Sequence, residues 1–230
     1  MKRAGPALAL IAGLLVIAAL LALGTWQVQR LAWKEALIAQ VDARVHADPV
    51  APPATISADD AYTRVTVRGR YLPDASSLTQ AATARGSGYW VLSPLIADSG
   101  QTILINRGFV NERRVPPVPT GEQRVTGLLR LSEPDGGFLR DNDPAADRWY
   151  SRDVPAIAAK RGLSDIAPYF IDAEAGAPVP GQPIGGLTII HFANNHLVYA
   201  ITWYILAAMA AAALIYLTRN RRRPTGGGAA

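Results

Sequence analysis

The stretch NNHLVYAITWYILAAM, Asn194 to Met209, begins with polar residues and passes directly into apolar ones. The uncharged block that it opens continues to Leu217, and another uncharged block covers Ala7 to Leu23. An α-helix needs about 20 apolar residues to cross the hydrocarbon core of a bilayer. The sequence therefore predicts two transmembrane helices, at residues 7–25 and 194–217.

The net charge of +5 comes from the ends of the chain. Six basic residues flank the two blocks; they are Lys2, Arg3, Arg219, Arg221, Arg222 and Arg223. Removing these six from the 23 basic residues leaves 17 against 18 acidic residues, which argues against a nucleic-acid groove in the middle of the chain. Basic flanks stay on the cytoplasmic side. We therefore expect both termini, including the basic tail at 218–230, to be cytoplasmic and the middle of the chain to lie outside.

Two further features bear on this topology. Arg30 and Lys34, close to the outer end of the first block, are a mild objection to it. The first block also resembles a cleaved signal peptide, with an Ala22-x-Gly24 site, but it exceeds the usual apolar region of about 7–15 residues. The absence of cysteine excludes disulfides, thiolate catalysis and a lipoprotein anchor.

The middle of the chain predicts a mainly antiparallel β-domain at 55–174. Alternation in YTRVTVRGRY indicates a strand, and GYWVLSPLI and QTILINRGFV, joined by ADSG, indicate a hairpin. Further predicted strands are QRVTGLLRLSE, RWYSRDV and PYFIDAE, and DVPAIAAKRG predicts a short helix capped by Asp153 and Gly162. A juxtamembrane helix and linker at 26–54 and a linker at 175–193 join the domain to the spans. The fold class is thus an α+β membrane protein, with a small barrel favoured over a sandwich.

One side of the second span carries an unusual set of residues. On a helix, spacings of three, four and seven place His196, Tyr199, Ala200, Trp203, Ala207, Ala210 and Leu214 together. Small residues let another helix or a flat ring approach closely, and Ala9 and Gly13 of the first span form a matching pair. The two spans are therefore expected to pack side by side.

Three roles for His196 remain open from the residues alone. The histidine caps the helix, shares a divalent metal with His191, or is an axial ligand of a haem iron. The metal reading is weak, because residues five apart diverge on a helix. In the haem reading, Trp203 flanks the macrocycle and Arg30 or Lys34 pairs with propionates.

Other chemistry has little support in the sequence. There is no G-x-S-x-G, HExxH, P-loop or Rossmann motif, and His46 lies far from any serine motif. Asp141, Asp143 and Asp147 in DNDPAAD lack the glycine and glutamate of an EF-hand loop, so a polar loop is expected.

Several long motifs in a fixed order resemble the surfeit-locus (Shy-type) family of cytochrome c oxidase assembly proteins. They are LGTWQVQRLAWKEALI, RGRYL, GYWVLSPL, ILINRGFV, DNDPAADRWYSRD, PYFIDA and PIGGLTIIHFANNHLVYAITWY. The resemblance covers about Leu23 to Tyr204. It implies a non-enzymatic factor of the bacterial cell inner membrane, or of the mitochondrial one, that assists insertion of haem a into the large catalytic subunit of the oxidase.

The resemblance also implies roles for individual residues. His196 matches the motif histidine implicated in haem binding in bacterial members, which makes it the expected axial ligand of the haem iron. Trp203 matches the motif tryptophan, and Trp26, Gln27 and Arg30 match the family signature after the first span. With Tyr199, these give a predicted haem site of His196, Trp203, Trp26, Arg30 and Tyr199. Gly108, in NRGF, is expected to be structural.

Two alternatives carry different expectations. A scaffold that binds oxidase intermediates without holding haem would be colourless. A membrane-tethered β-domain that binds a small ligand or peptide would leave oxidase assembly intact when lost.

Overall fold

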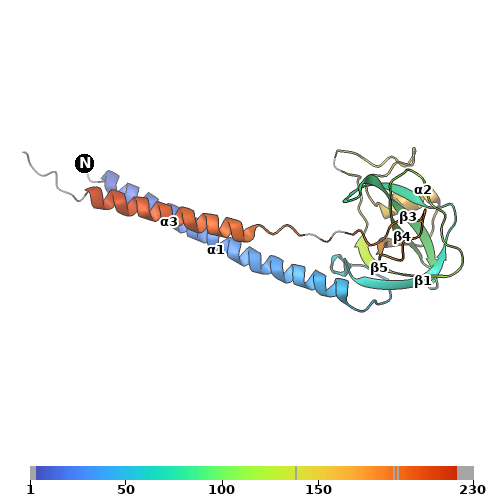
Figure 1. Cartoon of the computed structure of the whole chain (residues 1–230). Helices are drawn as coiled ribbons and strands as arrows, with labels where there is room; N and C mark the ends of the chain where they lie inside the picture. The colour runs from blue at the N-terminus through green and yellow to red at the C-terminus, as the bar shows by residue number, and fades with distance from the viewer. Residues whose placement is uncertain (1–3, 138, 189, 191, 222–230) are drawn as a thin grey trace, which may run out of the picture. The chain divides into compact units, whose positions relative to one another are not determined.

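The computed structural model describes residues 4–137, 139–188, 190 and 192–221. They divide into two compact units: one gathers the described residues up to Gln40 and from Phe192 onward, and the other is Val41–Ile190 (Figure 1). The elements are α1 (Ala4–His46), η1 (Ala58–Asp60), β1 (Arg64–Tyr71), β2 (Ser77–Thr83), β3 (Gly86–Ala97), β4 (Thr102–Val110), β5 (Gln123–Leu131), α2 (Val154–Arg161), β6 (Ile166–Ala173) and α3 (His196–Arg221).

The helices α1 and α3 are both long and apolar enough to cross a membrane. Their most apolar windows are only 6% and 11% buried, unlike those of a helix in a protein core. At 43 residues α1 is about 65 Å long, roughly twice the thickness of the hydrocarbon core. A single helix thus includes both the first apolar block and the predicted juxtamembrane helix.

The less exposed side of each long helix repeats at alternating steps of three and four. On α1 these residues are Gly13, Ile17, Leu20, Gly24 and Gln27, and on α3 they are His196, Ala200, Trp203, Ala207, Ala210 and Leu214. A Cβ on Gly13 would lie 2.9 Å from Leu214, whereas Gln27 meets His196. The helices therefore pack side by side and antiparallel, as expected, along seams rich in small residues.

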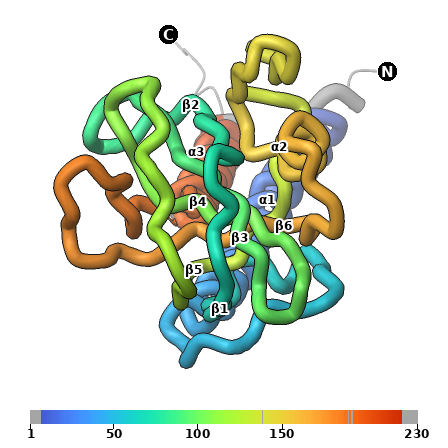
Figure 2. Tube along the Cα trace, turned by 90° about the vertical axis from the view of Figure 1, so that its right-hand side faces the viewer, coloured from blue at the N-terminus to red at the C-terminus, as the bar shows by residue number. Residues whose placement is uncertain are grey.

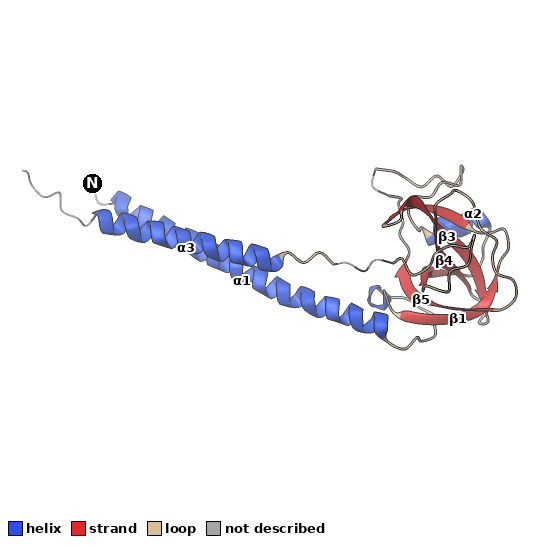
Figure 3. Ribbon diagram, in the orientation of Figure 1, coloured by secondary structure: helices blue, strands red, loops and turns tan. Residues whose placement is uncertain are grey.

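The second unit is built on a closed β-barrel (Figure 2 and Figure 3). The strand order is β1-β5-β6-β4-β3, and pairing of β1 with β3 closes the ring, while β2 extends the sheet beyond β3. The pair β4–β6 is parallel and the others are antiparallel. The closed ring confirms the barrel preferred from sequence. The predicted strands at β1, β5 and β6 and the predicted β3–β4 hairpin are confirmed as well.

Two hydrophobic clusters hold this unit together. The barrel interior is filled by alternate residues of the strands: Val65, Val67, Leu95, Ala97, Ile103, Ile105, Val125, Leu129, Ala167, Tyr169 and Ile171. Helix α2 covers an outer face through Leu92, Leu104, Trp149, Val154, Ile157 and Phe170. Its predicted caps are confirmed, because Asp153 accepts from the Ala156 N–H at 3.1 Å and Gly162 adopts a left-handed φ of 64°.

The strand predicted at RWYSRDV is wrong. Trp149 makes only an isolated bridge with Thr79 and is 2% exposed in the cluster under α2. The side-chain oxygen of Asn142 accepts from the backbone N–H groups of Tyr150 and Ser151, so a side chain satisfies donors that a neighbouring strand would otherwise satisfy. Strand β2, which no sequence pattern predicted, pairs with β3 over seven residues.

The loop containing DNDPAAD is held by ion pairs. Asp143 contacts Arg148 at 2.7 Å, and Asp147 contacts Arg161 at 2.7 Å. Both carboxyl groups keep a pKa below the usual value: hydrogen bonding by Arg148 is the main cause for Asp143, while for Asp147 the effect of Trp149 and Arg161 outweighs burial. This is the polar loop expected from sequence.

The segment that leaves β6 is fastened to the barrel at two places. Ile184 exchanges backbone hydrogen bonds with Phe109 at 2.9 and 3.0 Å. This approach requires Gly108, whose φ is 125° and where a Cβ would lie 2.2 Å from the Ile184 carbonyl oxygen. The structural role expected for Gly108 is therefore confirmed. Farther on, Thr188 donates to the buried carboxylate of Asp172 at 3.0 Å.

Candidate functional site

The motif histidine is oriented by a side chain from the other helix. His196 is the first residue of α3 and is partly buried in the seam. Its Nδ1 lies 2.7 Å from Oε1 of Gln27, a residue of α1 that is only 9% exposed. The two residues are 169 positions apart in sequence, so the antiparallel packing of the helices creates this contact.

This hydrogen bond fixes the chemistry of the imidazole. An amide oxygen can only accept, so Nδ1 carries the hydrogen and donates it to Gln27. In the neutral imidazole, the other ring nitrogen, Nε2, then keeps its lone pair for a ligand. A histidine that binds a metal almost always donates its second ring N–H to an oxygen in this way, which sets the ring orientation and raises its basicity.

Small residues bring the helices close together next to this pair. Ala200, one turn after His196, is 2% exposed. A Cβ on Gly24 would lie 2.8 Å from the ring of Tyr204, and the Tyr204 hydroxyl is 3.2 Å from the Thr25 hydroxyl. Close backbone approach leaves little freedom for the helices to slide, so Gln27 and His196 are held in register.

The structure brings together only part of the predicted haem site. His196 and Trp203 lie in the seam, each partly buried. Trp26 is 50% exposed and Tyr199 is 54% exposed, so both rings lie outside the helix contact rather than within it. The reason is that the seam follows residues 196, 200 and 203, and Tyr199 falls to its side. The participation of these side chains in a haem site stays a prediction.

The cations of α1 next to the site stack on aromatic rings. The Arg30 guanidinium lies 4.3 Å from the ring centre of Trp33, one turn farther along α1. The Lys34 amine lies 5.3 Å from the ring centre of Phe192, which precedes α3. Cation–π contacts of this kind anchor charged groups beside an apolar region while leaving them able to pair with an anion.

One buried polar atom near His196 has no partner among the described residues. The side-chain oxygen of Asn194 is buried and makes no hydrogen bond within the described part of the chain. A buried acceptor without a donor is uncommon in native structures and calls for a ligand or water partner. His191, the second histidine of the weak metal alternative, lies outside the described residues.

Taken together, these groups suit an axial imidazole ligand. An oriented Nε2, exposed indole and phenol rings, and nearby cations are the features that a haem and its propionates require. Sequence reasoning named Gln27 only through its motif and missed its contact with His196. It also missed Asn194, for which the doubled asparagine before the histidine was the available signal.

Comparisons with known proteins agree on one family. The model described as "SURF1 family" matches residues 14–208. The chain is 37% identical to "Surfeit locus protein 1" of Rattus norvegicus over 228 residues, covering 89% of this chain and 73% of the relative. It is 38% identical to the protein of the same name from Xenopus tropicalis, covering 85% and 71% of the two chains. With that of Homo sapiens it shares 38% identity, covering 81% and 69%.

Proposed function

Because this chain belongs to the SURF1 family, we propose that it is an assembly factor for haem-copper cytochrome c oxidase that binds haem a through His196. The two long apolar helices and the family make it a membrane protein. The observation that carries the haem proposal is the 2.7 Å contact between His196 Nδ1 and Gln27 Oε1. This contact leaves the lone pair of Nε2 available to bind a metal.

The proposed haem site lies where α3 begins, beside the middle of α1. A bound haem would supply an iron that an imidazole can ligate. His196 would be that ligand, Trp203, Trp26 and Tyr199 would contact the macrocycle, and Arg30 would pair with a propionate. Ligation by a single, partly exposed histidine would hold haem loosely enough for its transfer to the large oxidase subunit. No catalytic residue is assigned, since binding and release of haem convert no substrate into a product.

The proposed orientation follows the basic flanks. Both termini are cytoplasmic, and the β-barrel unit lies on the periplasmic side of a bacterial inner membrane, or on the corresponding side of the mitochondrial one. Support comes from Arg219 at the end of α3 and from the basic residues of both tails.

The test compares two histidines of the same chain. His196→Ala and His46→Ala are purified from cells that make haem a, and haem occupancy and absorption spectra are recorded. His46 is a matched control because it lies on α1, where its Nδ1 contacts the Asp42 carbonyl oxygen at 2.9 Å. We expect His196→Ala to lose haem and His46→Ala to keep it. Equal occupancy in both variants would remove His196 as the ligand.

A third variant separates ligation from orientation. Gln27→Leu keeps the imidazole but removes its acceptor, and loss of such a partner typically costs 10–100-fold in metal affinity. If the wild-type protein is colourless yet still co-purifies with the oxidase subunit, the scaffold alternative replaces the haem proposal.

A further inference from the structure

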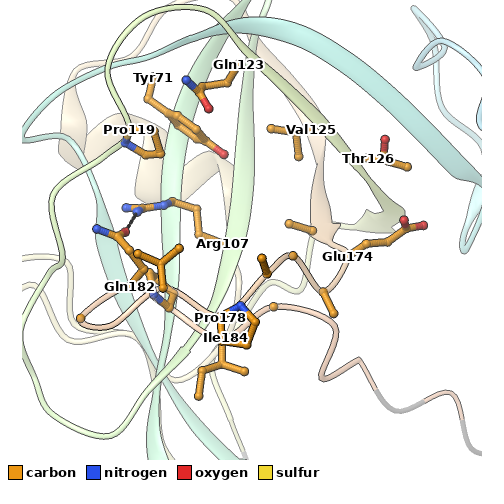
Figure 4. A pocket seen from close by; sticks show the side chains of 18 of the residues that line it. Tyr71, Arg107, Pro119, Gln123, Val125, Thr126, Glu174, Pro178, Gln182 and Ile184 are labelled. Carbon is orange, nitrogen blue, oxygen red and sulfur yellow. Dashed lines mark hydrogen bonds between the residues drawn. The ribbon is translucent and has the colours of Figure 1, made fainter.

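A groove of about 1320 Å³ lies at one end of the barrel. Its walls are the ends of β1, β4, β5 and β6 and the proline-rich segment that follows β6, residues 174–185 (Figure 4). We call it the barrel-mouth groove. The open ends of β-barrels are frequent ligand sites, because strand ends and loops surround a preformed cavity there.

A buried cation without a counter-ion lies in this groove. Arg107 is 9% exposed and donates to Pro116 O at 3.2 Å, Pro117 O at 2.9 Å and Gln182 Oε1 at 2.5 Å. All three acceptors are neutral, and no carboxylate of the described residues forms an ion pair with it. Two of the five guanidinium N–H donors therefore remain available to a ligand, and the positive charge is not neutralised.

The cost of this arrangement is visible in the neighbouring groups. Burial lowers the pKa of Arg107 and raises the pKa of Tyr71, whose ring centre lies 5.7 Å from the guanidinium, to about 12. Elsewhere in the same barrel, Arg130 and Arg152 are both paired with the carboxylate of Asp172. Buried charges in proteins are normally paired with an opposite charge, as Arg130 and Arg152 are. Arg107 has no such partner among the described residues, so its position suits an external anion.

The groove also contains an open strand edge. Pairing of β5 with β6 ends at Gly127 and Ala173, after which Glu174 N–H donates to Thr126 O at 3.0 Å. Backbone groups alternate between the two edges of a strand, so Arg124, two residues before Thr126, faces the same side. Among the described residues no strand pairs with β5 there. An open edge of this kind accepts an extended chain as an additional strand.

The charges lining the groove favour an acidic occupant. Arg85, Arg107 and Arg124 line it together with one carboxylate, that of Glu174. Glu174 is already bound by Arg64 at 2.6 and 3.1 Å. The remaining field in the groove is thus positive, which attracts an anion and disfavours a basic segment.

We propose that the barrel-mouth groove binds an extended polypeptide segment carrying an acidic side chain. The segment adds to β5 through the backbone N–H and C=O groups of Arg124, next to the point where Glu174 N–H already occupies the Thr126 carbonyl oxygen. Its carboxylate pairs with Arg107 and replaces the amide oxygen of Gln182. This site is separate from His196 and does not depend on haem binding.

The test uses a pair of dye-labelled peptides, acetyl-TVTETVT-amide and acetyl-TVTQTVT-amide, with the full-length protein in detergent. Binding is measured by fluorescence anisotropy. We expect the glutamate peptide to bind about 10–100-fold more tightly, the effect of a hydrogen bond to a charged group. Arg107→Gln removes this preference, whereas Arg70→Gln, at an exposed position of β1, keeps it and controls for net charge.

Further arms decide each part of the proposal. Gln182→Glu supplies a carboxylate from within the chain, so it should abolish the peptide preference and raise the melting temperature. This variant tests the site even if Arg107→Gln folds poorly.

A glutamate peptide with N-methylated backbone should bind weakly. Equal binding of the two parent peptides to the wild-type protein overturns the carboxylate site, and equal binding of the N-methylated peptide overturns strand addition. Acetate competing as well as the peptide at equal concentration overturns a polypeptide ligand. Haem occupancy should be unchanged in every variant of this groove.

Discussion

The substitution Asp172→Asn tests the buried ion cluster that joins the barrel to the segment leading to α3. The Asp172 side chain is 2% exposed. It accepts from Asn106 Nδ2 at 2.7 Å, Arg130 Nη1 at 2.8 Å, Arg152 Nη1 at 3.2 Å and the Thr188 hydroxyl at 3.0 Å. Asparagine keeps the volume but removes the charge, so it isolates the electrostatic contribution.

The expected magnitude follows from what remains after the substitution. Breaking a buried ion pair by removing one partner costs about 3–5 kcal/mol, because the other charge stays buried. Here Glu133 still contacts Arg152 at 2.6 Å and Arg130 at 3.3 Å, so one of the two positive charges remains neutralised. Since the Glu133 side chain is 38% exposed, its compensation is screened by solvent. We therefore expect a loss near the lower limit, about 3 kcal/mol.

The assay is urea unfolding of the full-length protein in detergent, followed by tryptophan fluorescence, with Trp149 buried in the barrel unit as a main reporter. A matched control is Asp98→Asn, at an exposed position after β3, which should change the free energy of unfolding by no more than about 0.5 kcal/mol. A loss below about 1 kcal/mol for Asp172→Asn, or one equal to the control, would refute the argument that the carboxylate neutralises buried arginines.

Three further predictions concern the barrel mouth, the linker and the helix seam. The folded-state pKa of Tyr71 is about 12 against an ordinary value near 10, so the stability that its neutral form contributes below pH 10 is lost as pH rises through 12. Tyr71→Phe should abolish this pH-dependent loss of about 3 kcal/mol in urea unfolding. Gly108→Ala places a Cβ against the Ile184 carbonyl at a φ of 125°, so it should cost about 2–4 kcal/mol in the same assay and open the linker to limited proteolysis; an unchanged cleavage pattern would contradict the close approach. Gly24→Leu should push α1 and α3 apart at Tyr204. Because the chain has no cysteine, spin labels on one introduced cysteine in each helix can measure the distance between the helices. An unchanged distance would argue against the seam.

The features that could be predicted from sequence are those set by neighbouring residues. Uncharged runs of about 20 residues indicate spans whatever they contact, and alternation in β1 places Val65 and Val67 on one face. Helix α2 begins and ends where Asp153 and Gly162 satisfy its backbone groups, which again is a local effect. Position on a helix also placed His196 and Trp203 on one side, because the 3.6-residue period holds in any environment.

Contacts between distant residues were decided only by the tertiary structure. Hydrophobic patterning is compatible with several strand partners, so it does not decide which segments meet. Only the tertiary structure decides that β1 and β3 close the ring, that β2 pairs with β3 and that Trp149 lies outside a strand. The same holds for Gln27 at His196, for the four donors around Asp172 and for the unneutralised charge of Arg107. A residue type states which hydrogen bonds and charges a side chain offers, but three-dimensional packing selects the groups that satisfy them and leaves some available for a ligand.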